Sequence, residues 1–151
     1  SGRYGYAGEI ANIIVDRNRP KLNHLNPGAV ENWASGTAIV QQAQQEISSD
    51  IESALTVFNL ANEGNTKAQK IIDDMVIDFA SMLSTIAHVV EPYMFVIGGG
   101  VSKSHKFYLD RVIEEFKNRV HPGMRHTKFE LAKLEEPGVI GAAMLCTMNQ
   151  E

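Results

Sequence analysis

Three consecutive glycines, Gly98, Gly99 and Gly100, are the residues whose type and position best suit phosphate binding. They follow a short apolar run, Met94–Ile97, and a helical pattern begins near Ser104. An apolar run that ends at glycine is typical of a buried strand, and glycine lets a ligand approach the backbone closely. The N-terminus of the following helix would offer free N–H groups and a positive dipole end to an anion. In open α/β sheets, ligands bind at this carboxyl end of a strand.

The same glycines could instead form a tight connection between a strand and a helix that binds nothing. Two standard nucleotide motifs do not explain them. The turn lacks the G-x-G-x-x-G spacing of dinucleotide-binding folds, and no P-loop lysine stands at the required offset. On the residues alone, both interpretations of the turn stay open.

Composition and charge narrow the class of protein. The 151 residues are enough for one domain with a substantial core, and the hydrophobic content of 44% is ordinary for a globular protein. The net charge of -4 argues against a nucleic-acid-binding surface. The single cysteine, Cys146, excludes a disulfide framework and a zinc site built from several cysteines. No apolar run has the length of a membrane span and no signal peptide is visible, so a cytoplasmic location is expected.

The first half of the chain is predicted to contain one strand and two helical stretches. β-Branched residues favour a strand over residues 9–15. Residues 28–46 have a helical pattern with a possible break at Ser35. Ser49 and Glu52 have the spacing of a capping box, which would begin a helix that runs to about residue 62.

The second half is predicted to alternate between helices and strands. Thr66–Val90 has the longest helical period, with an apolar stripe formed by Ile71, Met75, Phe79, Met82, Leu83, Ile86 and Val90. The strand Met94–Ile97, a helix over residues 104–119 and a second strand over residues 128–134 follow. A final helix would begin at residues 137–138 and run through Met148. This alternation indicates an α/β domain in which helices cover a sheet.

Five short motifs occur in an order and at distances that resemble one protein family. They are GEIAN at residues 8–12, GAVE at 28–31, ASG at 34–36, IGGGVS at 97–102 and GVIGAA at 138–143. Together they resemble the C-terminal half of the ROK family, which comprises bacterial sugar kinases and sugar-responsive repressors. The resemblance runs from Gly2 to about Leu145. It implies an α/β fold of the actin-like ATPase (ribonuclease H-like) type, of which this chain would be one lobe, a mixed sheet with covering helices.

The resemblance implies a sugar site formed by Glu9, Asn12 and Glu31. Glu9 and Glu31 match two glutamates that contact sugar hydroxyls in the family, and Asn12 takes the position of a histidine. The residue types suit this role, because a carboxylate can accept two hydroxyl donors and an amide can both donate and accept. Trp33, two residues after Glu31, could stack on a sugar or belong to the core.

The resemblance also allows a prediction about a structural zinc site. Counted without gaps, the three cysteines of the family's zinc loop fall on Leu22, His24 and Ala29, and its histidine falls on Asn12. Zinc needs about four ligands of the Cys, His or carboxylate type, so no structural zinc is expected. The loop of residues 16–27 would then hold its shape by turns and packing.

The nucleotide contacts that the resemblance implies are Gly98, Gly99, Gly100 and Gly138, through their backbone, with ATP and Mg²⁺ as the cofactors. The family's Asp-x-Gly-Gly-Thr phosphate motif and its catalytic Asn-Asp pair do not occur in this sequence. Residues 1–151 are therefore expected to be the C-terminal lobe of a sugar kinase or regulator whose N-terminal lobe lies outside the chain. This lobe alone should have no catalytic residue and no activity.

Two functions remain open. One is an ATP-dependent kinase for a hexose-type sugar, in which this lobe would orient the sugar and hold the nucleotide; the complete glycine turn favours it. The other is the sugar-sensing domain of a transcriptional repressor, and a non-catalytic sugar-binding remnant is a third possibility. In the family the strand at residues 9–15 follows two others. Its edge would be exposed here and would recruit a partner, either a second copy or the N-terminal lobe. The expected partners are thus a sugar, ATP and a dimer mate, with no nucleic acid and no membrane.

Overall fold

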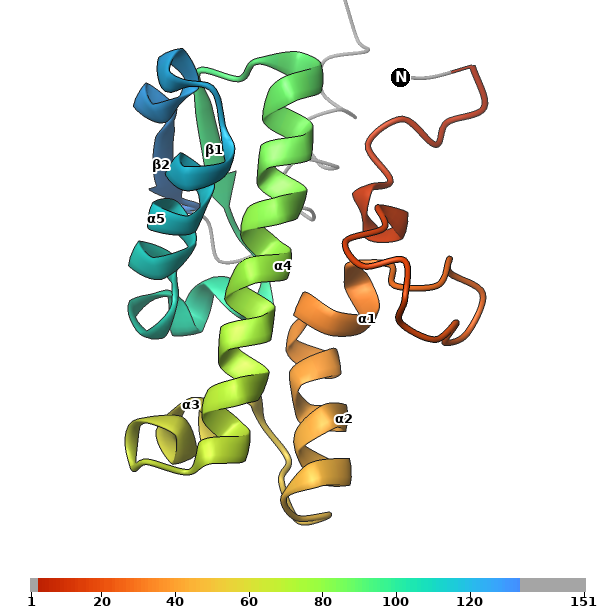
Figure 1. The fold of residues 1–151 in the computed structure, drawn as a ribbon, viewed down its shortest axis with the longest axis vertical. Coiled ribbons are helices and arrows are strands. Elements are labelled where there is room, and N and C mark those ends of the chain that lie inside the picture. The colour runs from red at the N-terminus through yellow and green to blue at the C-terminus, as the bar shows by residue number, and fades with distance from the viewer. Residues whose placement is uncertain (1–2, 134–151) are drawn as a thin grey trace, which may run out of the picture.

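The computed structural model of the chain describes residues 3–133. One long helix, α4 (Thr66–Val90), runs through the middle of the molecule (Figure 1). Asn65 begins α4, since its side chain accepts a hydrogen bond of 3.0 Å from the amide of Ala68. Glu91, in a left-handed conformation with a φ of 45°, ends it just before Pro92. The predicted bounds of this helix are confirmed, because both ends are fixed by local residues.

The predicted apolar stripe of α4 forms the centre of the core. Ile71, Met75, Met82 and Leu83 are buried, and Phe79 and Ile86 pack against them while partly exposed. Only the last member of the stripe, Val90, is exposed in the final turn. One polar residue, Asp78, is buried on the same helix at 3% exposure, and its charge requires a partner.

Helices pack on both sides of α4 (Figure 1). On one side lie α1 (Glu31–Ala34) and α2 (Gly36–Glu46), and on the other lies α5 (Leu109–Arg119). A further helix, α3 (Ala54–Asn62), contacts the N-terminal part of α4. The four helices around α4 therefore bury its apolar stripe from several directions.

Serine side chains mark where two of these helices begin. Ser35 separates α1 from α2 and accepts a hydrogen bond from the amide of Ala38 at 3.1 Å, so the predicted break is confirmed. The prediction that Ser49 begins α3 is wrong. Ser53 takes that position and accepts a hydrogen bond from the amide of Thr56 at 3.2 Å.

Two strands, β1 (Met94–Ile97) and β2 (Lys128–Leu131), form a parallel sheet. A parallel pair needs a crossover connection, which the 3₁₀ helix η2 (Gly100–Phe107), α5 and a shorter 3₁₀ segment, η3 (Pro122–His126), provide. The ring of Phe116 on α5 meets those of Phe95 and Phe129 edge to face, with centroid distances of 5.9 and 5.2 Å. The predicted strand Met94–Ile97 is confirmed, and the second predicted strand begins at Lys128 as expected but ends at Leu131, short of its predicted end at residue 134. Of the helix predicted over residues 104–119, the first residues belong to the 3₁₀ helix η2, and α5 begins at Leu109.

Residues 9–15 do not form the predicted strand. The 3₁₀ turn η1 (Ile10–Asn12) occupies the middle of the segment. Among the described residues, 13–15 pair with residues 28–30 through backbone hydrogen bonds of 2.8 and 3.0 Å around an isolated antiparallel bridge. β-Branched residues favour extended backbone, yet a sheet strand needs a neighbouring strand, and this segment folds onto its own loop instead. The exposed strand edge predicted at residues 9–15 is therefore not formed, and the expected dimer stays a prediction without that support.

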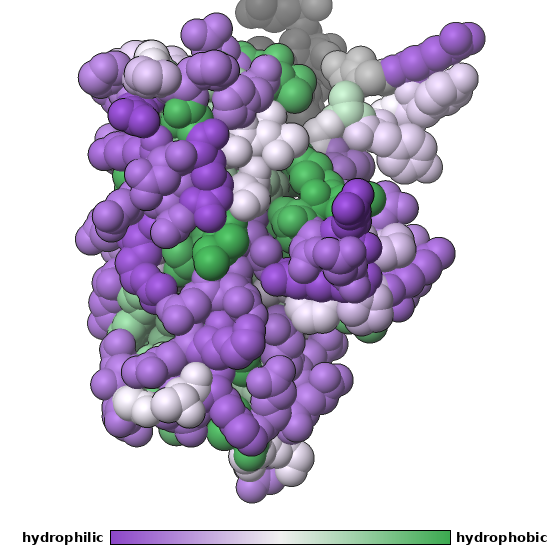
Figure 2. Space-filling model, viewed as in Figure 1, coloured by the Kyte–Doolittle hydropathy of each residue, from purple (hydrophilic) through white to green (hydrophobic). Residues whose placement is uncertain are grey.

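The predicted final helix, from residues 137–138 to Met148, and the candidate nucleotide contact Gly138 lie outside the described residues. In the described range 3–133, no helix is both long and apolar enough to cross a membrane. Most of the face seen in Figure 2 is hydrophilic, and hydrophobic surface gathers between α4 and the N-terminal segment.

Candidate functional site

One cavity brings predicted sugar and nucleotide residues together. Glu9, Glu31 and Gly98 all line this cavity, which has a volume of about 400 Å³. Its apolar walls come from α1, α4 and the end of β1, through Val30, Ala34, Phe79, Met82 and Ile97. Carboxylates beside apolar walls suit a ligand that carries both hydroxyl groups and C–H surface, as a sugar does.

The two carboxylates are available to a ligand. Both Glu9 and Glu31 are exposed, and neither accepts a hydrogen bond or forms an ion pair with the residues that the structure describes. Glu9 precedes η1 and its amide donates to the carbonyl of Tyr6 at 3.1 Å. Glu31 is the first residue of α1. Their carboxylates can therefore accept hydrogen bonds from hydroxyl donors in the cavity.

The backbone pairing of residues 13–15 with 28–30 holds the two carboxylate-bearing segments together. It joins the chain shortly after Glu9 to the chain shortly before Glu31. Gly28 makes this pairing possible, because its φ is +69° and a Cβ atom there would lie 1.8 Å from the carbonyl oxygen of Asp16. Only glycine has both the conformation and the space that this position requires.

Asn12 has a different contact from the one expected. Its side-chain oxygen accepts a hydrogen bond of 2.7 Å from the amide of Asn26, and it is not among the residues that line the cavity. In this conformation the Asn12 side chain holds the loop that follows it rather than facing the cavity.

The glycine turn of residues 98–100 includes a backbone conformation that favours glycine, and its backbone is accessible to a ligand. Gly99 has a φ of +78°, which favours glycine, and a Cβ atom at Gly99 or Gly100 would meet no atom of residues 3–133 within 4 Å. The hydroxyl of Ser102 donates to the carbonyl of Gly99 at 2.7 Å. The Ser102 hydrogen bond therefore stabilises the turn, and the space where the Cβ atoms would lie leaves its backbone open to a ligand.

The loop of residues 16–27 does not have the donors of a zinc site. Leu22 and Ala29 carry no ligating atom, Ala29 is fully buried, and Asn12 offers an amide in place of an imidazole, so zinc does not fit these positions. Side-chain amides hold the loop instead. Asn23 donates to the side-chain oxygen of Asn32 at 2.8 Å, and Asn32 donates to the carbonyl of Leu22 at 3.2 Å.

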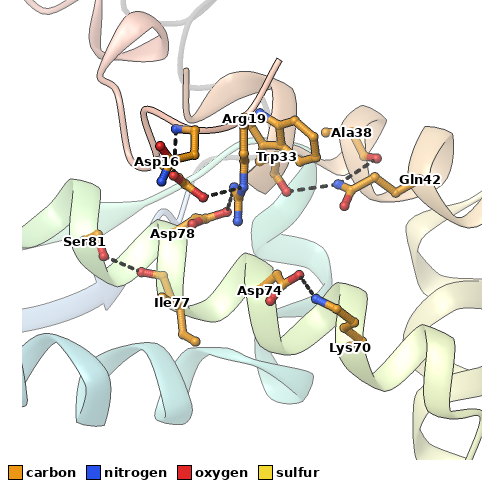
Figure 3. Close-up of polar contacts among 11 residues, drawn as sticks. Asp16, Arg19, Trp33, Ala38, Gln42, Lys70, Asp74, Ile77, Asp78 and Ser81 are labelled. Carbon is orange, nitrogen blue, oxygen red and sulfur yellow. Dashed lines mark hydrogen bonds and ion pairs between the residues drawn. The ribbon is translucent and has the colours of Figure 1, made fainter. Parts of the chain in front are cut away.

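An arginine that sequence reasoning missed ties this loop to α4 (Figure 3). The Arg19 guanidinium forms an ion pair with the carboxylate of Asp78 and lies 3.5 Å from that of Asp16. Its central carbon lies 4.6 Å from the centre of the Trp33 ring. Burial raises the pKa of the Asp78 carboxyl, although Arg19 acts in the opposite direction. Trp33 thus packs against Arg19 and is not among the residues that line the cavity.

Comparison with known proteins decides the family. The sequence profile of the ROK family matches residues 1–149. This chain belongs to the ROK family. A glucokinase from Thermotoga maritima is 26% identical over 160 residues, which cover 96% of this chain and 50% of that protein. An N-acetylmannosamine kinase from Yersinia pestis is 30% identical over 147 residues, which cover 95% and 48%.

A solved structure gives the same answer for the fold. The ROK family glucokinase from Streptomyces griseus, in complex with glucose and AMPPNP, superimposes with a TM-score of 0.78 at 26% identity, covering 95% of this chain and 52% of that one. The ROK chain described here therefore has the actin-like ATPase fold of these sugar kinases, and the predicted family and fold are confirmed. It spans about half the length of the relatives it matches.

Proposed function

We propose that this chain supplies the sugar-binding and nucleotide-contacting part of an ATP-dependent kinase for a hexose-type sugar. The observation that carries the proposal is that Glu9, Glu31 and Gly98 line one cavity. Phosphoryl transfer requires a sugar hydroxyl and the terminal phosphate of ATP to lie side by side. A cavity that joins carboxylate acceptors to an open glycine turn offers that arrangement.

Each group has a role in this proposal. Glu9 and Glu31 accept hydrogen bonds from sugar hydroxyls and so orient the sugar. The backbone of Gly98, Gly99 and Gly100 lies against the phosphates of ATP, with Gly138 as a further contact. Mg²⁺ neutralises the phosphate charge. We place the catalytic base and the remaining phosphate motifs in an N-terminal lobe, so that residues 1–151 are the C-terminal lobe of the kinase.

A sugar-sensing regulator would use the same carboxylates without phosphoryl transfer. Two observations favour the kinase. Both curated relatives described above are named as kinases, and the glycine turn has the left-handed Gly99 and the open backbone that close approach of a phosphate requires.

The test is sugar-dependent release of ADP by the intact protein with glucose and with N-acetylmannosamine as probes. Glu31→Gln should weaken sugar binding by about 1–3 kcal/mol, the scale of a lost charge-assisted hydrogen bond. Glu63→Gln, at an exposed glutamate in the turn after α3, is the matched control and should leave binding unchanged. Sugar binding without ADP release would indicate a regulator, and failure to bind either sugar would contradict the proposed site.

A further inference from the structure

Arg19 lies where three parts of the fold meet (Figure 3). Arg19 itself and Asp16 belong to the loop of residues 16–27, Trp33 belongs to α1, and Asp78 belongs to α4. We call these four residues the Arg19 clamp. Of the ion pairs formed by the described residues, this one has the most buried carboxylate, since the Asp78 side chain is 5% exposed.

The chemistry of the clamp is specific to arginine. A planar guanidinium can pair with two carboxylates at its edge and stack its face on an aromatic ring at the same time. Arg19 does all three, with Asp78 and Asp16 at its edge and the Trp33 ring at its face. A lysine would keep the charge but lose the planar fork and much of the stacking.

The clamp connects two walls of the cavity. Trp33 shares the four-residue helix α1 with Glu31, and so short a helix depends on tertiary contacts for its position. Asp78 immediately precedes Phe79, and Phe79 and Met82 form the α4 wall. A shift of Arg19 would therefore change the position of Glu31 relative to α4.

We propose that the Arg19 clamp is a positioning device that holds Glu31 at a fixed place relative to the α4 wall and thereby sets the affinity of the cavity for a sugar. The inference rests on the proposed function, because it assumes that Glu31 binds the sugar. The loop of residues 16–27 lacks the donors for zinc. Among the described residues, the ion pair between Arg19 and Asp78 connects this loop to α4 instead.

The test uses Arg19→Met in the intact protein, with calorimetric titration of glucose, N-acetylmannosamine and AMPPNP. Methionine keeps the apolar stem but leaves the Asp78 carboxylate without its partner. We expect sugar affinity to fall about tenfold or more, the scale of a small misplacement of a binding group. AMPPNP affinity should change by about twofold at most, because the glycine turn does not touch the clamp.

Lys70→Met is the matched control. Lys70 pairs with Asp74 at 2.6 Å on the exposed side of α4. Loss of the Lys70 charge should leave the affinities for sugar and for AMPPNP unchanged. Arg19→Lys should give an intermediate loss of sugar affinity. The double variant Arg19→Met/Asp78→Leu removes both charges, so thermal stability should recover while sugar affinity stays low.

The outcomes separate the two proposals. If Glu31→Gln weakens sugar binding while Arg19→Met lowers only the stability, the clamp is structural and the inference is wrong. If sugar affinity recovers together with stability in the double variant, the inference is also overturned. If the wild-type protein binds neither sugar, the proposed function fails and the inference fails with it.

Discussion

Gly28 is the residue on which the geometry of the proposed sugar site depends most directly. Its positive φ turns the chain back so that residues 28–30 pair with residues 13–15. Because Glu9 and Glu31 lie on either side of this pairing, a change at Gly28 should act on the stability of the loop and on the cavity together.

Gly28→Ala is expected to lower the free energy of unfolding by about 1–3 kcal/mol from the positive φ alone. The clash of the new Cβ atom with the Asp16 carbonyl, 1.8 Å away, adds to this. Gly64→Ala is the matched control, since Gly64 also has a positive φ, +94°, but a Cβ atom there meets nothing within 4 Å. Urea denaturation of both variants measures the difference, and equal losses would contradict the role given to the Asp16 contact.

Single residues were predictable where their role is local and unpredictable where it depends on distant contacts. The motif match identified Glu9 and Glu31, and the structure places both in one cavity, while their role in binding remains a proposal. The partnership of Arg19 with Asp78 joins residues 59 positions apart. No spacing rule connects such a pair, so only the packing of the loop on α4 reveals it.

At the scale of elements, the start of α3 shows how two local signals compete. Ser49 and Glu52 have the spacing of a capping box, but Ile51, between them, is buried at 4% exposure and belongs to the core. The Ile51 amide donates to the carbonyl of Ser48 at 3.3 Å, and the Ile51 carbonyl accepts a hydrogen bond of 2.8 Å from the Gln44 side chain. Residues 49–52 therefore lie outside the helix, and Ser53 caps α3. Thr66–Val90 had no such conflict, because its period, its first residue and its end all pointed to the same helix.

Ser53→Ala should lower the free energy of unfolding by about 1 kcal/mol, the usual cost of losing an N-terminal cap. The variant loses the hydrogen bond that the Ser53 hydroxyl accepts from the Thr56 amide. Ser49→Ala should have almost no effect, because the partner of the Ser49 hydroxyl among the described residues is the carboxylate of the neighbouring Asp50, at 3.4 Å. Thermal denaturation followed by circular dichroism compares the two, and a larger loss at Ser49 would restore the capping box as the start of the helix.

At the scale of the whole molecule, α4 organises both the core and the cavity. Its buried face carries Met75 and Leu83, while Phe79 and Met82 reach the cavity wall. The period of the sequence predicted this helix and the two strands, and their order indicated an α/β domain. It did not predict how residues 9–15 would fold, because a strand exists only with a neighbour that the sequence pattern does not specify.

Tyr108, at the start of α5, reports on the integrity of this core. It is 1% exposed, and its ring stacks near Phe58 with a centroid distance of 5.8 Å. Burial raises the pKa of Tyr108 to about 12. Since this pKa lies above the ordinary tyrosine value of 10.0, the folded state favours the neutral phenol. The resulting stability is fully present below pH 10 and is lost as the pH rises toward 12.

Ultraviolet absorbance of the phenolate during an alkaline titration tests the raised pKa of Tyr108. The Tyr108 phenol should ionise in a step with a midpoint near 12 or at the alkaline unfolding transition. Tyr108→Phe should remove this step, whereas Tyr93→Phe, at an exposed position, should leave it in place. Urea denaturation at increasing pH should show the wild-type protein losing about 2 kcal/mol more than Tyr108→Phe between pH 10 and 12, which is most of the value of a shift of about two pKa units. If the Tyr108 phenol ionised near its ordinary value of 10.0 in the folded protein, its ring would be in contact with water, and its packing against Phe58 and Phe79 would have to be different from that described.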